Sequence, residues 1–283
     1  MSLTTNTLIF VHIPKSAGTT LSRIIDWEYD PRRIYSVIGR YFRWSYNRLL
    51  RLPQRRLSQI QVFKGHMPFG LHQHLKRPAI YLTVLRNPVD RAISDYCFSA
   101  NGRLHPDHRQ VKNLTLREFI DTTPYNNIQT KLLAGQIPGY DFLAGECTPE
   151  MFTAATENLR NHFALVGLTE RFEESLALAK VLFGWSVRRY VSFRVTRGRP
   201  SEESIPPATR SLIAERNAFD VALYDQAVGL FEELAARNRE DIADAVRALR
   251  HAREIGATES LFYRCTSAVL KAFTNVNSAV GIC

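Results

Sequence analysis

The sequence of 283 residues contains no apolar run of the roughly 18 residues that a membrane-spanning helix needs. Glycine (14), proline (13) and cysteine (4) are too scarce for a collagen-like, low-complexity or disulfide-scaffold protein. A hydrophobic fraction of 45% is too high for an intrinsically disordered chain. What remains is a globular protein, long enough to bury a core as one large domain or two small ones.

The first twenty residues lack the basic segment and the longer apolar stretch of a secretory signal peptide. The four cysteines lie far apart, without the paired spacing of a metal site: Cys97, Cys147, Cys265 and Cys283. We therefore expect that the mature chain begins at its first residue and that the protein is cytoplasmic. We also expect four unrelated thiols and no bound metal.

Acidic residues are outnumbered, with 27 Asp+Glu against 37 Lys+Arg and a formal net charge of +10. This balance predicts an anionic partner such as nucleic acid, an acidic sugar, an anionic lipid or a polyphosphate-like cofactor. Residues 31–56 hold eight arginines and no acid. Their apolar residues recur at helical spacing, which predicts a basic amphipathic helical region. It could bind an acidic saccharide, lie on an anionic membrane, or be a solvated helix face.

Short apolar runs alternate with helical patterns along the chain. The runs typical of buried strands cover residues 8–13, 61–64, 79–85, 163–167 and 191–195. The helical patterns cover residues 88–100, 115–135, 149–161 and 208–255, with a further helix around residues 176–181. This alternation predicts an α/β fold with a central, mostly parallel sheet flanked by helices. We expect one domain over residues 1–255 and a docked tail helix over residues 256–283.

The loop after the first predicted strand, HIPKSAGTT, has the composition of a phosphate-binding loop. A loop that opens a helix offers free main-chain N–H groups and the positive end of the helix dipole. Lys15 adds a full positive charge, Gly18 permits close approach of the main chain, and hydroxyl donors come from Ser16, Thr19 and Thr20. The loop differs from that of nucleoside triphosphatases, whose glycines precede the lysine.

The strand AIYLTVL, residues 79–85, ends at Arg86, and Ser94 follows two helical turns later. A kinase-like site would place a magnesium-binding acid near such a strand end. An always-charged guanidinium is instead suited to bidentate phosphate binding, although Arg86 could also pair with Asp90.

The two loops together resemble the sulfotransferases that use 3′-phosphoadenosine 5′-phosphosulfate (PAPS). IPKSAGTT resembles the family's loop for the 5′-phosphosulfate, and LRNPVDRAISDYCF resembles its 3′-phosphate motif. Further segments resemble the carbohydrate branch, near the heparan-sulfate 2-O-sulfotransferases (sulfotransferase family 2): KGHMPFGLH, NNIQTKLLAG, FALVGLTERFEESL and RNAFDVALYDQA. The resemblance implies a P-loop-like sulfotransferase fold and transfer of a sulfuryl group to a carbohydrate or glycoconjugate hydroxyl. The eukaryotic members carry a membrane anchor and lumenal disulfides that this sequence does not show, which favours a soluble bacterial-type enzyme.

The resemblance also implies the roles of the site residues. Lys15 stabilises the leaving phosphate, Arg86 and Ser94 bind the 3′-phosphate, and a basic loop that includes Arg197 and Gly198 closes the nucleotide site. The 5′-phosphosulfate ligands are then Lys15, Ser16, Ala17, Gly18, Thr19 and Thr20.

The general base is expected to be a histidine near the acceptor. His66 follows the second predicted strand, so a parallel sheet brings it to the same edge as Lys15. Its unperturbed pKa lies in the working range, and the carbohydrate members are similar in using a histidine in this loop. His72 and His74 are nearby rivals, and His12 is expected to pack beneath the lysine loop.

Two other functions compete with sulfuryl transfer. One is a kinase of the P-loop type, which would need the glycine-before-lysine pattern and a magnesium-binding acid. The other is a non-catalytic polyanion-binding protein. No zinc-finger or ribonucleoprotein signature is present, and we expect no nucleic-acid partner.

Overall fold

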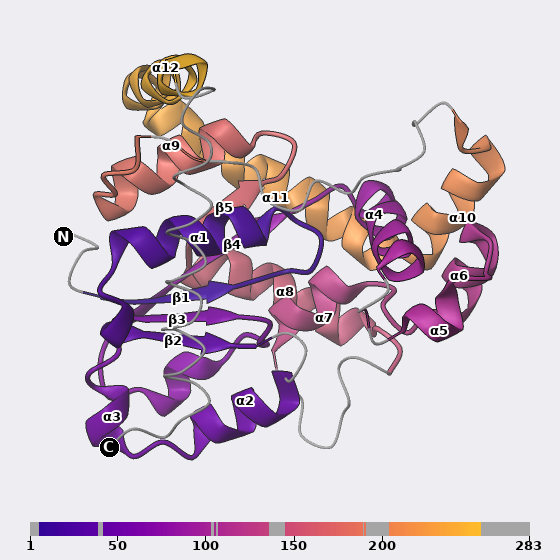
Figure 1. The fold of residues 1–283 in the computed structure, drawn as a ribbon, viewed down its shortest axis with the longest axis horizontal. Helices are drawn as coiled ribbons and strands as arrows, with labels where there is room; N and C mark the ends of the chain where they lie inside the picture. Colours follow the sequence, from indigo (N-terminus) through magenta and orange to yellow (C-terminus); the bar gives the residue numbers. More distant parts are fainter. Residues whose placement is uncertain are drawn as a thin grey trace.

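A sheet of five parallel strands lies at the centre of the computed structural model, which describes residues 6–38, 42–102, 105, 107–135, 145–188, 190 and 204–255. The strands are β1 (Thr7–Val11), β2 (Ile34–Val37), β3 (Val62–Gly65), β4 (Ala79–Leu85) and β5 (Phe163–Leu168). Their order in the sheet is β2-β3-β1-β4-β5 (Figure 1). Every neighbouring pair is parallel, which confirms the predicted α/β class.

The three central strands end together at one edge of the sheet. Val11, the last residue of β1, pairs with Gly65 at the end of β3 and with Thr83 near the end of β4. The chain leaves β1 toward β2 at one side of the sheet and leaves β4 toward β5 at the other. The neighbouring strands β1 and β4 therefore form the topological switch point, where ligands bind in open α/β sheets.

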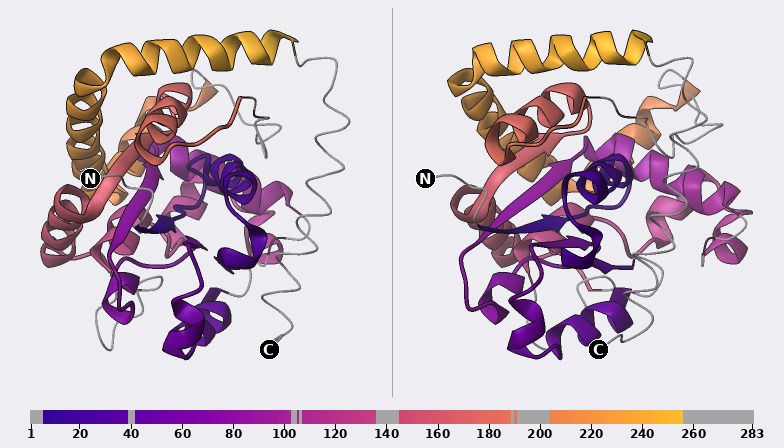
Figure 2. Two further views of the ribbon diagram at one scale, coloured as in Figure 1. Left: turned by 90° about the vertical axis from the view of Figure 1, so that its left-hand side faces the viewer. Right: turned by 60° about the vertical axis from the view of Figure 1, so that its left-hand side comes forward.

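Helices connect the strands and cover the sheet (Figures 1 and 2). They are α1 (Gly18–Glu28), α2 (Phe42–Leu50), α3 (Gln54–Leu57), α4 (Pro88–Asn101), α5 (His108–Val111), α6 (Leu116–Thr122), α7 (Ile128–Ala134), α8 (Pro149–His162), α9 (Phe172–Phe183), α10 (Pro207–Arg216), α11 (Ala218–Arg237) and α12 (Arg239–Ile255). Two 3₁₀ turns, η2 (Pro31–Arg33) and η4 (Leu71–His74), complete the described elements. The outermost helix, α12, packs on α9, and Arg250 Nε donates a hydrogen bond to Glu173 Oε2 at 2.8 Å.

The main hydrophobic core surrounds the sheet. All five residues of β1 are buried because strands flank it on both sides and helices cover both faces. This explains why β1 is a nearly continuous apolar run rather than an alternating one. A smaller cluster, which includes Ile93, Phe119 and Ile213, joins α4, α6 and α10 beside the carboxyl edge.

The prediction of one helical region over residues 31–56 is wrong in part. Ile34–Val37 forms β2, because Ile34 and Val37 are buried at its two ends and the strand pairs with β3. The three-residue spacing of these buried residues suggested a helix, but in a four-residue strand at the edge of the sheet it marks only the two ends. Residues 42–50 and 54–57 are helical as predicted.

Two long predicted helices are interrupted. Residues 115–135 form α6 and α7 with Pro124 between them, and residues 208–255 form α10, α11 and α12. The predicted strand over residues 191–195, the loop with Arg197 and Gly198, and the tail over residues 256–283 lie outside the described residues. The division into domains therefore stays a prediction. Within the described residues, no helix combines the length and hydropathy that a bilayer crossing requires.

Candidate functional site

The lysine loop after β1 has an unusual backbone. Lys15 and Ala17 adopt positive φ angles of 68° and 53°, in the left-handed region that non-glycine residues rarely occupy. Ala17 is the N-cap of α1, and Thr20 N–H donates to its carbonyl oxygen at 3.0 Å. No described side chain caps the helix. The first N–H groups of α1 therefore point toward the loop, where they can bind an anion.

The loop also contains a buried hydroxyl group available to a ligand. Ser16 is 1% exposed, and its Oγ finds no hydrogen-bond partner among the described residues. Burying a polar group without a hydrogen-bond partner lowers the stability of the fold. An anion that accepts a hydrogen bond from this hydroxyl would therefore stabilise the loop.

Gly18 leaves room for a neighbouring side chain, and its predicted approach to an anion stays a prediction. A Cβ added to Gly18 would lie 2.1 Å from His12 Cδ2, so the glycine makes room for the imidazole. As predicted, His12 lies beneath the loop, with its ring stacked at 4.3 Å on the ring of His66.

The lysine loop packs against α4. Lys15 Nζ lies 3.7 Å from the ring centroid of Phe98, in a cation–π contact. Ser94 lies one helical turn before Phe98, so both side chains share the face of α4 that meets the loop. Ser94 is 3% exposed. The structure thus brings Ser94 to the side of α4 that Lys15 contacts, and its role as a 3′-phosphate ligand stays a prediction.

Arg86 joins the ends of β4 and β1. Its Nη1 donates a hydrogen bond to the main-chain oxygen of Lys15 at 3.0 Å. The main chain of Arg86 is bound by Gln129, whose Oε1 accepts from Arg86 N–H at 3.0 Å and whose Nε2 donates to Arg86 O at 2.9 Å. Arg86 is thus held beside the lysine loop, and the alternative of a pair with Asp90 stays a prediction.

His66 follows β3 at the same edge of the sheet. Its Nδ1 lies 2.8 Å from the main-chain oxygen of His12. A carbonyl oxygen only accepts, so the proton of the neutral imidazole is on Nδ1 and the lone pair is on Nε2. This is the tautomer that a general base requires, with its ring orientation fixed by β1.

The two other candidates for the base, His72 and His74, do not lie beside the lysine loop. His72 Nδ1 lies 2.8 Å from the Tyr81 hydroxyl, which also accepts N–H bonds from Gly70 and His72. Tyr81 pairs with Phe163, the first residue of β5, so this contact lies toward the amino ends of the strands, away from Lys15. Burial, with a smaller contribution from His162, lowers the pKa of His72.

His74 is exposed, and its carbonyl oxygen accepts a hydrogen bond from Gln54 Nε2 at 2.9 Å.

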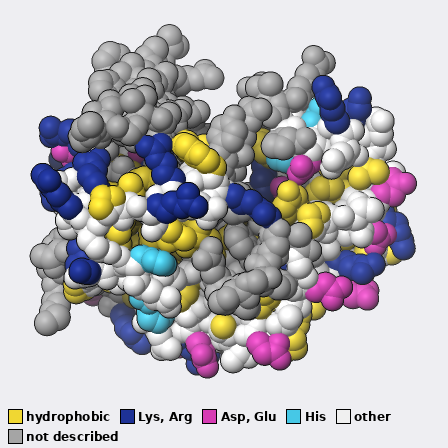
Figure 3. Space-filling view, turned by 90° about the horizontal axis from the view of Figure 1, so that it is seen from below, with side chains coloured by type: hydrophobic (Ala, Val, Ile, Leu, Met, Phe, Trp, Pro, Cys, Tyr) yellow, Lys and Arg dark blue, Asp and Glu magenta, His cyan; other side chains and the backbone are white. Residues whose placement is uncertain are grey.

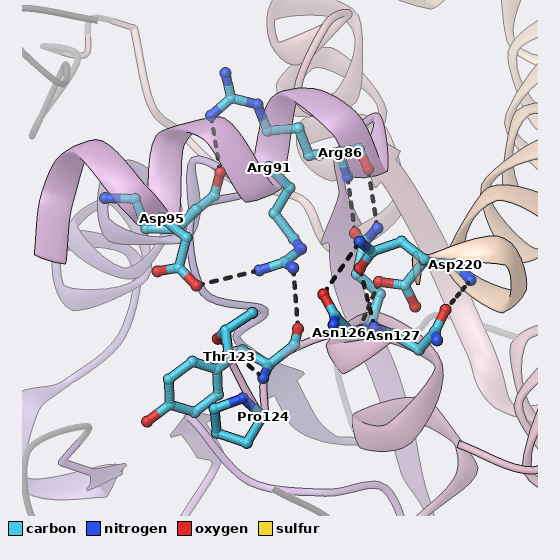
Figure 4. Close-up of polar contacts among 12 residues, drawn as sticks. Arg86, Arg91, Asp95, Thr123, Pro124, Asn126, Asn127 and Asp220 are labelled. Atoms are coloured by element: carbon cyan, nitrogen blue, oxygen red, sulfur yellow. Dashed lines mark hydrogen bonds and ion pairs between the residues drawn. The ribbon is translucent and has the colours of Figure 1, made fainter. Parts of the chain in front are cut away.

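A buried carboxylate fixes the N-terminus of α7. Asp220, from α11, accepts hydrogen bonds from the N–H of Gln129 at 3.2 Å and from the N–H and hydroxyl of Thr130 at 2.7 and 2.8 Å. Arg91 lies in the same region, with Nη2 donating to Tyr125 O at 3.1 Å and Nη1 3.6 Å from Asp95 Oδ2 (Figure 4). Burial raises the pKa of Asp220 and the positive charge of Arg91 opposes this.

Sequence reasoning missed Gln129, Asp220 and Phe98 as parts of the site. Gln129 and Asp220 lie within the segments NNIQTKLLAG and RNAFDVALYDQA, which the resemblance had singled out without assigning roles. Their contact spans 91 residues of sequence, so no local spacing reveals it.

A buried ion pair joins the strand before His66 to the helix after the lysine loop. Lys64 Nζ contacts Asp26 Oδ1 at 2.5 Å, Ser22 O at 2.8 Å and Ser22 Oγ at 2.9 Å. Both charged side chains are almost fully buried. Burial lowers the pKa of Lys64, while the carboxylate of Asp26 acts in the opposite direction. The pair holds β3 and α1, and therefore the two site loops, in one relative position.

The arrangement is suited to an extended anion. Lys15 and Arg86 supply two positive charges at the switch point, Ser16 and the start of α1 supply hydrogen-bond donors, and the imidazole of His66 lies at the same edge of the sheet. Among the described residues, no three His, Cys, Asp or Glu side chains gather where they could hold a metal ion.

The chain is similar in sequence to proteins that are named as carbohydrate sulfotransferases. A family model described as galactose-3-O-sulfotransferase matches residues 5–271. The bovine (Bos taurus) galactose-3-O-sulfotransferase 3 is 24% identical over 268 residues, which cover 88% of this chain and 62% of the relative. The heparan sulfate 2-O-sulfotransferase hst-2 of Caenorhabditis elegans is 23% identical over 267 residues, covering 84% of this chain and 82% of that protein. A solved structure, mouse sulfotransferase SULT7A1 complexed with PAP, aligns at a TM-score of 0.36 and 15% identity over 77% of this chain and 66% of that one.

Proposed function

We propose, because the chain belongs to the galactose-3-O-sulfotransferase family, that it transfers a sulfuryl group from PAPS to a hydroxyl of a carbohydrate or glycoconjugate acceptor. The relatives' names are those of carbohydrate sulfotransferases, which confirms the carbohydrate branch that the motifs predicted. The observation that carries the proposal is that Lys15, Arg86 and His66 follow three neighbouring strands at one edge of the sheet, where Arg86 binds the main chain of Lys15 and His66 binds that of His12. The chain spans about 62% of the bovine relative's length.

The described residues fit the donor. The unpartnered hydroxyl of Ser16 and the start of α1 would bind the 5′-phosphosulfate, and Arg86 with Ser94 would bind the 3′-phosphate. Arg86 and the lysine loop are already in contact, so the sites for the two anionic groups are adjacent. Arg197 and Gly198 stay predicted contacts.

Bound PAPS supplies an activated sulfuryl group: the acceptor oxygen forms a bond to sulfur, the bond from sulfur to the phosphate oxygen breaks, and adenosine 3′,5′-bisphosphate (PAP) leaves. Lys15 stabilises the negative charge that develops on the departing phosphate. Its ammonium group rests on the Phe98 ring, and Arg86 holds the main chain behind it. The side chain of Lys15 is therefore already ordered before the donor binds, so donor binding does not have to reduce its conformational entropy.

His66 takes the acceptor proton at Nε2. The bond from Nδ1–H to His12 O keeps Nε2 unprotonated in the neutral ring and stabilises the imidazolium that forms. His12 thus contributes through its main chain, whereas its ring packs beneath Gly18.

The arginines of α2, α3 and the turn between them are proposed to contact an acidic saccharide. This α2–α3 basic surface comprises the exposed Arg43, Arg51, Arg55 and Arg56 and the half-buried Arg48. In Figure 3, Lys and Arg side chains gather with hydrophobic ones over the left-hand half of the face, while most acidic side chains lie on the right-hand half. Trp44, 54% exposed, lies with its ring 5.4 Å from Arg48 Cζ. Because β2 adjoins β3 and α2 starts just beyond β2, the surface begins at the edge that carries His66.

An anionic membrane would fit the same charges, and membrane contact through residues 31–56 stays an alternative prediction. The cytoplasmic location and the bacterial source predicted from the sequence also stay predictions.

Selective binding of PAP tests the donor. The thermal unfolding temperature should rise with PAP in the absence of magnesium, and much less with AMP or ATP. A ligand at 100 times its dissociation constant adds about 2.7 kcal/mol to the free energy of unfolding, a readily measured effect. The variant Arg86→Ala should reduce the difference between PAP and AMP, which differ by the 3′-phosphate. Stabilisation by ATP with magnesium alone would support the kinase alternative and overturn the proposal.

A further inference from the structure

The main chain of Arg86 lies just where the sheet stops providing hydrogen-bond partners. Thr169 N–H still donates to Leu85 O at 2.8 Å, and Asn87 N–H already donates to a side chain, Glu170 Oε1, at 2.9 Å. Between them, both main-chain groups of Arg86 are bound by the single amide of Gln129, at 3.0 and 2.9 Å. The side chain of Gln129 thus takes the place of a neighbouring strand.

Gln129 is itself fully buried and held from the other side. Its N–H donates to Asp220 Oδ2, and the next residue, Thr130, donates its N–H and hydroxyl to Asp220 Oδ1. Asp220 N–H in turn donates to Asn127 Oδ1 at 3.0 Å, which closes the contact between α7 and α11 (Figure 4). Gln129 is therefore fixed to α11 and fixes Arg86.

We propose that Gln129 is a positioning residue for the donor site. It sets the backbone of Arg86, and because Arg86 Nη1 donates to Lys15 O, it also sets the distance between the 3′-phosphate ligand and the lysine loop. This inference rests on the proposed use of PAPS. It adds that a buried amide, which touches neither donor nor acceptor, determines how strongly the site distinguishes a nucleotide with a 3′-phosphate from one without.

The variant Gln129→Met tests this, because methionine keeps the length of the side chain and removes both hydrogen bonds. The readout is the ratio of the dissociation constants for AMP and PAP, measured by calorimetry. Loss of these bonds should weaken PAP binding about tenfold, the usual scale for one to two buried hydrogen bonds, and leave AMP binding within about twofold. The Michaelis constant for PAPS should rise more than kcat falls.

Asn158→Leu is the matched control. Asn158 Nδ2 donates to Leu133 O at 2.8 Å and Ala134 O at 3.3 Å, so it binds main-chain groups at the opposite end of α7, away from Arg86. This variant should lose stability and keep the AMP-to-PAP ratio of the wild type. If Gln129→Met does not fold, Gln129→Asn replaces it, since asparagine keeps an uncharged amide and is too short to bind both main-chain groups of Arg86.

The outcomes separate the inference from the proposed function. A wild type that does not prefer PAP to AMP would contradict the use of PAPS itself. The positioning role alone would be overturned if the wild type prefers PAP, Arg86→Ala loses this preference, and the Gln129 variant keeps the AMP-to-PAP ratio of the wild type. Equal losses of the ratio in the Gln129 and Asn158 variants would also overturn it, because they would show a general effect of α7.

Discussion

Lys15 and His66 illustrate how single residues in this site are oriented by main-chain atoms. The positive φ of Lys15 places its carbonyl toward Arg86 and its ammonium group on Phe98. The carbonyl of His12 fixes the tautomer of His66. Strained or unusual backbone of this kind persists where surrounding contacts determine it, and it gathers at functional sites.

Replacing His66 by alanine tests its role as the base. Turnover should fall by about 10²–10⁴-fold, the usual scale for a positioned base, because the group proposed to receive the acceptor proton is removed. The affinity for PAP should be retained, since His66 is not among the proposed ligands of the donor. Steady-state kinetics and calorimetry on the same preparation measure both quantities. Near-normal turnover would place the base elsewhere.

Lys15, Arg86 and His66 could be predicted from the sequence because parallel strands end at one edge, so residues just beyond different strands meet there. The binding of Arg86 by Gln129 could not. A glutamine inside a helix looks like any solvated polar residue, and its partners Arg86 and Asp220 lie 43 and 91 residues away.

At the scale of elements, the long buried strands were predictable and the short edge strand was not. β4 contains seven residues and reads as a continuous apolar run, whereas β2 contains four and buries only Ile34 and Val37. Tertiary pairing with β3 decides the conformation of such a segment. The sheet is further joined to α1 by the buried pair of Lys64 and Asp26.

The variant Asp26→Asn should destabilise the protein by about 3–5 kcal/mol, because it leaves the ammonium group of Lys64 buried without a counter-charge. Urea unfolding measures the change. The double variant Asp26→Leu with Lys64→Met removes both charges and should recover much of the loss. A cost below about 1 kcal/mol for the single variant would show that the pair is not what joins β3 to α1.

At the scale of the whole molecule, the net charge of +10 is unevenly placed. The α2–α3 basic surface holds five arginines in sixteen residues without an acid, whereas the arginines of α11 and α12 alternate with glutamates and aspartates. Ion pairs such as Arg237 with Glu233 and Arg247 with Asp244 neutralise the latter. The field that an acidic acceptor meets is therefore concentrated along α2 and α3, which run from the carboxyl edge of the sheet back toward the starts of β3 and β4.

Replacing Arg43, Arg51 and Arg55 together by alanine should raise the Michaelis constant for an acidic polysaccharide about tenfold. Each exposed charge contributes modestly to binding, and the three contributions together give this change. The Michaelis constant for a neutral galactoside should not change, and added salt should reduce the difference. Replacing Arg237, Arg239 and Arg247 by alanine removes the same charge from α11 and α12 and serves as the control. An equal effect in both triple variants would contradict a local contact, and loss of binding to anionic vesicles without loss of glycan affinity would favour the membrane.

The most direct test of the account is transfer of labelled sulfate from PAPS to carbohydrate acceptors by the wild type and by Lys15→Ala. The wild type should sulfate a saccharide hydroxyl without added metal. Lys15→Ala should lose about 10²–10³-fold in turnover, because the charge on the departing phosphate is no longer stabilised, and it should bind polyanions as before. If Lys15→Ala transfers sulfate at a normal rate, or if its activity and its polyanion binding fall in parallel, the central role of the lysine loop is wrong.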